Sequence, residues 1–252
     1  GPNTKDAACG NKPEWAGMPC WSGAAGPLAA GGDLPDNRVT KYNYFLQPTE
    51  TVETSGSGAG LVTRTSTTGY DAAGRSVLSD TTVTGPVDAA PEPATRTTYS
   101  ATTGQQIKTE ALDAQGQVTG SESTKYDLWG RTIEEISQLG DVATTTYVAP
   151  GQAGAGQVAS VATTFGTTTH TTTYTYDGQD ANGQAEHRGL VTKMVVSGVG
   201  TYLGAYDDQA ALTTQIAPGG ITQRLVYDDL GQLTKQSYEG KVTTDDPDTG
   251  EL

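Results

Sequence analysis

The feature that most constrains this 252-residue chain is a short string that recurs along it. In each clear copy an aspartate follows a tyrosine or leucine, and a glycine stands three residues after the aspartate. The clear copies are Tyr70-Asp71-Ala72-Ala73-Gly74-Arg75, Leu112-Asp113-Ala114-Gln115-Gly116-Gln117, Tyr126-Asp127-Leu128-Trp129-Gly130-Arg131 and Tyr227-Asp228-Asp229-Leu230-Gly231-Gln232. Weaker copies start at Tyr99, Tyr176-Asp177 and Tyr206-Asp207. Such internal repetition predicts a repeat architecture.

Each position of the string has a physical role in a β-hairpin. The tyrosine closes a strand and supplies a large ring with a polar tip. The aspartate carboxylate can accept backbone N–H groups in an Asx-turn, and the glycine can take the positive φ that completes the turn. The arginine or glutamine then begins the return strand. One hairpin is marginally stable in water, so we expect the hairpins to stack into a continuous sheet.

The composition agrees with strands and disfavours helices. Threonine occurs 42 times and glycine 33 times, and both are poor residues for a helix interior. Short runs of Thr, Val, Tyr and Ile alternate with clusters of Gly, Asp and Asn, which is typical of strands joined by hairpin turns. The sequence therefore predicts an all-β fold of repetitive antiparallel β-hairpins. Because strand twist accumulates in one hand, we expect a curved, spiralling ribbon.

The recurrent string resembles the YD repeat of the Rhs and teneurin-like proteins, over about residues 40–240. The Cys9–Cys20 segment, with Asn11-Lys12-Pro13-Glu14-Trp15-Ala16-Gly17, resembles a segment of Rhs-type proteins of secreting Gram-positive bacteria. This resemblance implies a hairpin ribbon that forms part of a larger hollow shell. In toxin members the shell encloses a C-terminal effector, whereas in animal members it belongs to an adhesion ectodomain.

The composition of the chain and the extent of its repeats divide it into three regions. Residues 1–36 form a non-repetitive N-terminal segment, residues 37–244 the YD-repeat β-ribbon, and residues 245–252 an acidic C-terminal tail. The opening Gly1-Pro2 pair is typical of a remnant left by protease cleavage after expression, which is compatible with the removal of a native signal peptide. Because the stretch from Asp245 to Leu252 ends without a recognisable terminal element, we expect a fragment of a longer protein.

The two cysteines, Cys9 and Cys20, flank a short stretch rich in turn-forming residues. A local disulfide is the favoured interpretation, and two buried free thiols are the alternative. A disulfide would indicate an oxidising compartment, so we expect a secreted or cell-surface protein.

Charge narrows the set of partners. The chain carries 15 basic and 29 acidic residues, a formal net charge of −14. Nucleic acid must be neutralised by Lys and Arg, so neither it nor an anionic membrane is an expected partner. No apolar run is long enough for a membrane-spanning helix. The expected partners are the remaining YD repeats and the C-terminal domain of the parent protein.

No cofactor or resident metal is expected, and the catalytic motifs considered are weak. His170 and His187 lie in a strand-like run and a loop, without a nucleophile elbow. Neighbouring carboxylates such as Glu134 and Glu135 point to opposite faces of a strand and cannot share one site. The triplet Asp248-Thr249-Gly250 matches an aspartic-protease motif, but only one copy is present. We therefore expect no enzyme activity.

Two binding alternatives stay open. The stretch from Asp177 to Gln184 has spaced oxygen ligands for calcium, although a plain Asx/Gly turn is favoured. Aromatic side chains could stack on sugars or pack along the sheet; the candidates besides the repeat tyrosines are Tyr42, Tyr44, Phe45 and Trp129. The favoured function is a structural, non-catalytic section of a YD-repeat shell. The alternative is an extracellular adhesin or a module that binds cell-surface glycan.

Overall fold

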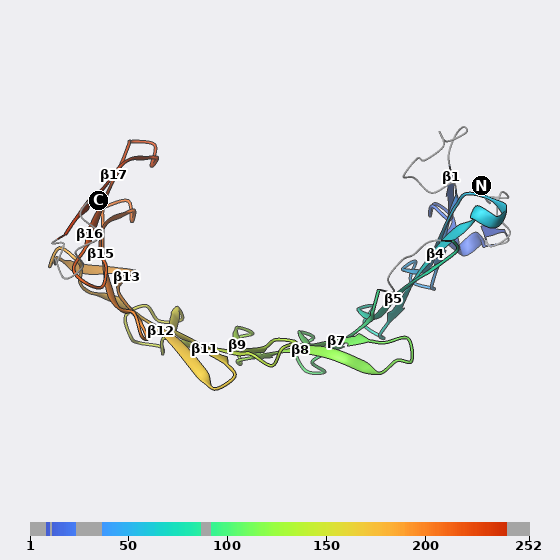
Figure 1. Ribbon diagram of the computed structural model, residues 1–252, viewed down its shortest axis with the longest axis horizontal. Helices are drawn as coiled ribbons and strands as arrows, with labels where there is room; N and C mark the ends of the chain where they lie inside the picture. Colours follow the sequence, from blue (N-terminus) through green and yellow to red (C-terminus); the bar gives the residue numbers. More distant parts are fainter. Residues whose placement is uncertain (1–8, 11, 24–36, 87–91, 241–252) are drawn as a thin grey trace. The chain divides into compact units, whose positions relative to one another are not determined.

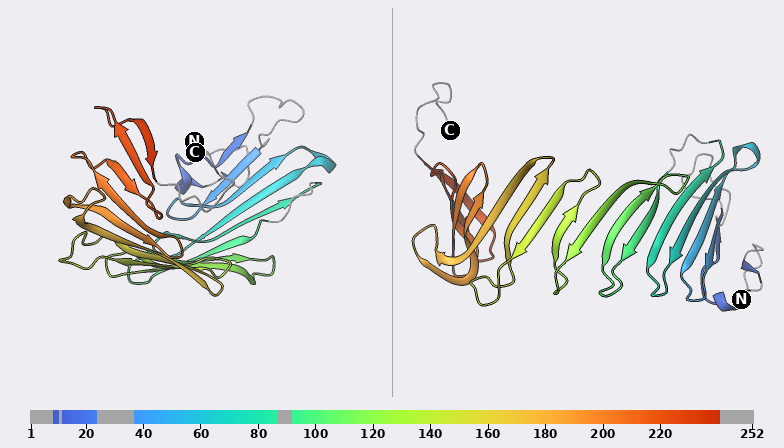
Figure 2. Two further views of the ribbon diagram at one scale, coloured as in Figure 1. Left: turned by 60° about the vertical axis from the view of Figure 1, so that its left-hand side comes forward. Right: turned by 90° about the horizontal axis from the view of Figure 1, so that it is seen from below.

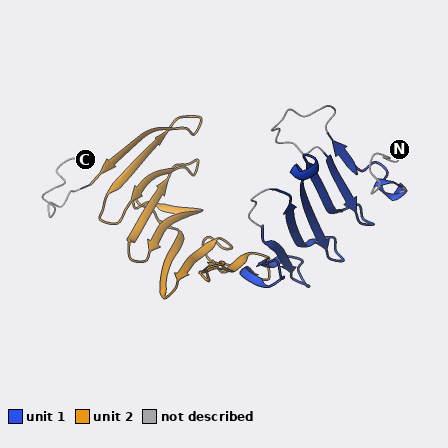
Figure 3. Cartoon of the chain, turned by 45° about the vertical axis from the view of Figure 1, so that its right-hand side comes forward, with its two compact units in different colours: residues 1–124 blue, residues 125–252 orange. Residues whose placement is uncertain are grey.

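The computed structural model describes residues 9–10, 12–23, 37–86 and 92–240, and it confirms the all-β prediction (Figure 1). The described residues contain no α-helix. Two short 3₁₀ turns, η2 (Pro13–Trp15) and η3 (Gly58–Gly60), are their helical elements. No helix among these residues is long and apolar enough to cross a membrane. The chain divides into two compact units, residues 1–124 and residues 125–252 (Figure 3).

The first unit contains β1 to β8, except that the last two residues of β8, Lys125 and Tyr126, belong to the second unit. These strands are β1 (Trp21–Gly23), β2 (Asn37–Tyr42), β3 (Pro48–Ser55), β4 (Val62–Tyr70), β5 (Ser76–Thr84), β6 (Ala94–Tyr99), β7 (Gln106–Leu112) and β8 (Val118–Tyr126).

The second unit is built from β9 to β17. These strands are β9 (Thr132–Ile136), β10 (Val142–Tyr147), β11 (Val158–Phe165), β12 (Thr168–Gln179), β13 (Ala185–Val196), β14 (Gly200–Tyr206), β15 (Leu212–Ile216), β16 (Thr222–Tyr227) and β17 (Leu233–Glu239).

Within each unit every strand pairs antiparallel with the next strand along the chain, so the sheet is a succession of hairpins (Figure 2). The register shifts by one residue at the tyrosine that ends a strand, as between Gly69 and Tyr70 in the β4–β5 pair. Such a shift is a β-bulge, which accompanies a three-residue hairpin loop with a left-handed residue.

The turns share one hydrogen-bonding pattern. In the Asp71–Arg75 turn the Asp71 N–H donates to the Arg75 carbonyl, and the Gly74 N–H donates to the Asp71 carbonyl, both at 3.0 Å. Nine turns in the described part of the chain follow this pattern. They span residues 43–47, 71–75, 113–117, 127–131, 137–141, 180–184, 207–211, 217–221 and 228–232. The fourth residue always has positive φ; it is glycine except at Leu46 and Ala210.

The structure corrects the assignment of one weak repeat. The sequence placed a repeat turn at Tyr176-Asp177, but Asp177 lies inside β12 with φ of +58°, and the turn starts at Asp180. The turns at Asn43, Ser137 and Ala217 carry no aspartate in first place, and the sequence did not identify them as copies.

Burial is sparse in both units. A hydrophobic cluster in the first unit combines Cys9, Trp15, Cys20 and Val39, with Met18, Trp21 and Tyr42 packed against it. In the described part of the chain, seven apolar and five polar or charged residues are buried. The sheet therefore leaves much of both faces in contact with solvent.

The predicted region boundaries stay predictions. The acidic tail, residues 245–252, lies outside the described residues, as does the Asp248-Thr249-Gly250 triplet. Of the N-terminal segment 1–36, the structure describes residues 9–10 and 12–23.

Replacing Gly130 with valine tests the turn geometry. Gly130 has φ of +80°, a left-handed conformation that a β-branched residue adopts only with strain. We expect Gly130→Val to lower the free energy of unfolding by about 1–2 kcal/mol, measured by urea denaturation. Gly60, which lies outside the positive-φ set and has open space around it, is the matched control, and Gly60→Val should change stability little. Equal losses from the two variants would contradict the turn assignment.

Candidate functional site

The candidate site lies, in each unit, along the side of the sheet where alternate strands end in a turn, and we call this row of strand ends the tyrosine edge. Since each strand pairs with the next, turns that follow alternate strands of a unit lie at the same edge. The strands that end there, β2, β4, β6, β8, β10, β14 and β16, all finish on a tyrosine, and β12 carries one three residues before its end. These tyrosines are Tyr42, Tyr70 and Tyr99 in the first unit and Tyr126, Tyr147, Tyr176, Tyr206 and Tyr227 in the second.

Six of the tyrosine hydroxyls each bond a hairpin to the one before it. Tyr70 donates to the carbonyl of Pro48, which pairs with Tyr42 in the preceding hairpin. The same bond recurs along the edge at 2.7–3.0 Å. Its further copies run from Tyr99 to Ser76, Tyr147 to Thr132, Tyr176 to Val158, Tyr206 to Val191 and Tyr227 to Leu212. In the first hairpin Tyr42 donates instead to Pro19, in the disulfide-closed segment.

A second set of bonds runs forward to the next turn. The Arg75 guanidinium donates to the Gly104 carbonyl at 3.1 Å, and Arg131 donates to the Gly156 carbonyl at the same distance. Glutamine fills this role at Gln47, whose amide donates to Gly74, and at Gln157, whose amide donates to Gly189. Three of these side chains thereby bond one turn to the next turn of the same unit, whereas Gln157 bonds to Gly189 within β13.

The arginines also stack on the following tyrosine. The Arg75 guanidinium lies 4.5 Å from the centre of the Tyr99 ring, and that of Arg131 lies 3.9 Å from the Tyr147 ring. These distances are in the range of a cation–π contact. Arg131 also lies 4.9 Å from the ring of Trp129, within its own turn.

The turn aspartates hold the backbone of the turn and the arginine together. Oδ1 of Asp71 accepts the N–H groups of Ala73 and Arg75 at 2.9 Å, and Oδ2 accepts the Arg75 guanidinium at 2.6 Å. The hydrogen bond from the Arg75 side chain, followed by that from its N–H, lowers the pKa of Asp71. Asp127 makes the same contacts with Trp129 and Arg131.

The pKa of Asp127 is also lowered, against an opposing effect. Desolvation acts to raise it, but the N–H and guanidinium of Arg131 outweigh that effect. Asp228 accepts the N–H groups of Leu230 and Gln232 at 3.0 and 2.8 Å, with glutamine in place of arginine at the fifth position. Gly231 has φ of +76°.

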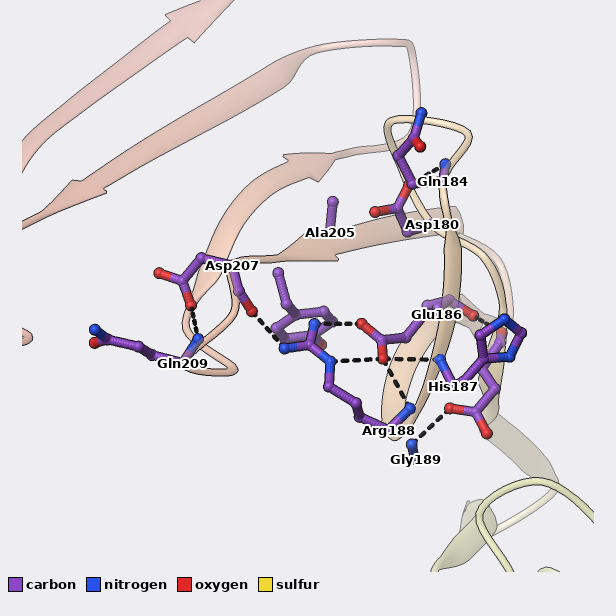
Figure 4. A network of polar contacts seen from close by, with 12 residues as sticks. Asp180, Gln184, Glu186, His187, Arg188, Gly189, Ala205, Asp207 and Gln209 are labelled. Carbon is purple, nitrogen blue, oxygen red and sulfur yellow. Dashed lines mark hydrogen bonds and ion pairs between the residues drawn. The ribbon is translucent and has the colours of Figure 1, made fainter.

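The turn between β12 and β13 is an enlarged version of the repeat (Figure 4). Here the two strands continue to pair beyond Tyr176, so the turn starts only at Asp180. Oδ1 of Asp180 accepts the N–H groups of Asn182 and Gln184 at 2.8 Å. Asp177 accepts the Gly189 N–H at 2.6 Å. The Asp180 carboxylate thus serves a turn, as the favoured interpretation of this stretch expected.

Glu186 takes over the role of the turn aspartate in this enlarged repeat. Its Oε1 accepts the N–H groups of His187 and Arg188 and the Nε of Arg188, and its Oε2 accepts Arg188 Nη2 at 2.6 Å. Arg188 then donates to the Asp207 carbonyl at 2.6 Å, in the next turn of the edge. The Arg188 hydrogen bond and the two N–H donors lower the pKa of Glu186 to about 2, although its side chain is only 5% exposed.

Three further residues considered in the sequence analysis, Asp113, His170 and His187, do not come together in one site. The Leu112-Asp113 copy lies at the opposite edge of the sheet, where Asp113 accepts the N–H groups of Gln115 and Gln117. His170 and His187 are exposed. Nowhere in the described ranges do three or more His, Cys, Asp or Glu side chains gather as metal ligands.

Cys9 and Cys20 form a disulfide, with their Cα atoms 5.8 Å apart. The closed segment packs Trp15 against Tyr42, with ring centres 5.7 Å apart. It therefore occupies the position that a preceding hairpin takes for the other tyrosines.

Comparison with known proteins gives partial structural likenesses. No family model matches the chain, and no curated protein matches it. Solved structures of TcdB2-TccC3-Cdc42 and of TcdB2-TccC3 without its hypervariable C-terminal region align with TM-scores of 0.46 and 0.44, at 20% and 19% identity. A Photorhabdus luminescens Tc holotoxin pore carrying a TccC3 mutation aligns with a TM-score of 0.44 at 19% identity. Each alignment covers 81% of this chain, which spans 12% of the length of each matched chain.

Removing one tyrosine hydroxyl tests the bond between hairpins. Tyr147→Phe keeps the ring beside Arg131 and deletes the donor to the Thr132 carbonyl, a bond of 2.8 Å. We expect a loss of about 1 kcal/mol in the free energy of unfolding, measured by urea denaturation. Tyr44, which is 89% exposed at a turn, is the control, and Tyr44→Phe should be nearly neutral.

The charge on Glu186 should make the second unit sensitive to acid. Because the folded pKa is about 2, below the ordinary value of 4.5, its stabilising contribution is complete above about pH 4.5 and is lost as the pH falls toward 2. Glu186→Gln should therefore lower Tm at pH 7. The Tm difference between the original protein and this variant should become smaller as the pH falls, as measured by thermal denaturation. Glu135→Gln, at an exposed position of β9, is the control. A Tm difference independent of pH would contradict this account.

Proposed function

We propose that the chain is a structural, non-catalytic section of a YD-repeat shell, resembling those that enclose a C-terminal toxin effector in secreted bacterial proteins. The observation that carries this is the double set of bonds along the tyrosine edge. Tyrosine hydroxyls reach back to the previous hairpin, and arginine or glutamine side chains reach forward to the next turn. Such ties let a single-layered sheet continue from hairpin to hairpin without a thick core.

The sparse burial supports the same role. A wall needs two accessible faces, and most residues of the described strands are half-buried or exposed. The chemistry-bearing side chains are used to hold turns: Asp71, Asp127 and Glu186 each accept backbone N–H groups and an arginine. In this proposal the chain contributes no reaction of its own, and its partners are further repeats and the enclosed domain.

The disulfide supports a secreted or cell-surface location for this wall. A bridge between Cys9 and Cys20 persists in an oxidising compartment.

Protease protection in the parent protein tests the enclosure. The parent reading frame is sequenced past the codon for Leu252, and any compact terminal domain is expressed with the repeats. We expect that domain to resist a protease when the wall is intact. When Arg131→Ala and Tyr147→Phe are combined, the domain should be cleaved at least tenfold faster, because the bonds from Arg131 to Gly156 and from Tyr147 to Thr132 are both lost. Tyr44→Phe is the matched control. A terminal domain cleaved at the same rate in all three proteins, or a frame that stops shortly after Leu252, would contradict enclosure.

Glycan binding is the second candidate, favoured by exposed aromatic rings at the turns. Tyr44, Phe45 and Trp129 are 89%, 74% and 71% exposed. Aromatic faces can stack on sugar rings. A glycan array with Trp129→Ala as the comparison distinguishes the two functions, because binding lost in this variant supports an adhesin and an empty array opposes it.

A further inference from the structure

The disulfide-closed segment, residues 9–10 and 12–23, lies along β2 in the first unit, and we call it the cap. One side of β2 pairs with β3, and the other pairs with β1 from Asn37 to Val39. The Thr40 N–H then donates to the Cys20 carbonyl at 2.8 Å. The cap therefore supplies the backbone partner on one side of β2.

The two cysteines hold the cap together. Cys20 directly precedes β1, whereas Cys9 lies outside the strands, and the bridge brings their Cα atoms to 5.8 Å. The buried cluster beneath the cap consists of Cys9, Cys20, Trp15 and Val39 of β2, so two of its four buried residues are the bridged cysteines. Because a cluster this small buries little apolar surface, we expect the position of the cap to depend on the covalent link.

Two further contacts join the cap to the tyrosine edge. The Tyr42 hydroxyl donates to the Pro19 carbonyl at 3.1 Å, and the Tyr42 ring lies edge-on to Trp15, with ring centres 5.7 Å apart. Tyr42 pairs in register with Pro48, whose carbonyl accepts the Tyr70 hydroxyl. The bonds of the tyrosine edge therefore continue from β4 through Tyr42 into the cap.

We propose that the cap is a redox latch on the β2–β3 hairpin. While the Cys9–Cys20 bridge is intact, the cap stays on β2 and bonded to Tyr42. When the bridge is reduced, the cap separates from β2, and its bonds to Thr40 and Tyr42 are lost. This goes beyond the wall function, because it concerns the response of the chain itself to the redox state of its surroundings. Its failure leaves the wall function intact, since that function is tested by protease protection in the longer protein.

A dithiol supplies both electrons of the reduction. One of its thiolates attacks a sulfur of the bridge, which forms a mixed disulfide and releases the other cysteine as a thiolate that takes a proton. The second thiol of the reagent then displaces the remaining cysteine, so the reagent becomes a disulfide and Cys9 and Cys20 become two thiols. Since Cys9 and Cys20 are only 4% and 7% exposed, the attack requires the cap to open first. The rate of reduction therefore reports how often the cap separates from β2.

The rate of reduction by dithiothreitol, followed by alkylation of the released thiols, tests the link between the bridge and the tyrosine edge. Tyr42→Phe deletes the donor to Pro19 and keeps the ring beside Trp15, so the cap should open more often and the bridge should be reduced about fivefold faster. Tyr44→Phe removes a hydroxyl from a side chain that is 89% exposed, and it should leave the rate unchanged. Equal rates for the two variants, or a bridge that stays oxidised until the whole chain unfolds, would overturn the proposal.

Hydrogen exchange of the whole chain before and after complete reduction tests the release itself. The Thr40 amide should exchange about tenfold faster in the reduced protein and regain its protection when oxidised glutathione reforms the bridge. The Asp113 amide, which donates to the Gln117 carbonyl at 2.9 Å in a turn of the same unit, should be unchanged. A Thr40 exchange rate that does not depend on the bridge would overturn the proposal. Equal acceleration at Asp113 would also overturn it, because the sheet would then be unfolding as a whole.

Discussion

The hydrogen bonding of the turn carboxylate is the interaction on which the rest of this structure depends. A sheet with so few buried apolar side chains obtains little stability from a core, so its backbone polar groups have to be held at the turns. One oxygen of Asp71 or Asp127 accepts two backbone N–H groups, and the other accepts an arginine. The arginine, fixed in this way, reaches the next turn and the next tyrosine ring.

The same task is performed by different residues at different turns. Asn43 uses its amide oxygen, Ser137 uses its hydroxyl, and Glu186 uses a longer carboxylate from a position two residues before its arginine. Glutamine replaces arginine at Gln47 and Gln157 and still bonds to the neighbouring carbonyl. What repeats along the chain is therefore the backbone pattern of the turn, which several side chains can support, and the turn at Ala217 forms it with backbone bonds alone.

This construction suits a wall whose length is set by the number of hairpins. Each hairpin is bonded to its neighbours through backbone ladders and through the tyrosine edge, so local contacts account for its stability. The disulfide-closed segment covers β2 by presenting the Cys20 and Pro19 carbonyls where a preceding hairpin would stand.

The sequence by itself determined the strand-turn-strand unit and the role of the aspartate and the glycine in the turn, and it favoured the local bridge between the cysteines that the structure contains. These depend on residues close together in the chain, so their spacing is sufficient to identify them. Only the tertiary structure decided that the tyrosines collect at one edge, because this requires knowing that each strand pairs with the next. Only the structure showed that Glu186 replaces the turn aspartate and that Asp180, not Asp177, starts its turn. The extra length of β12 and β13 separates the tyrosine from its turn, and no spacing rule along the chain records where two paired strands end.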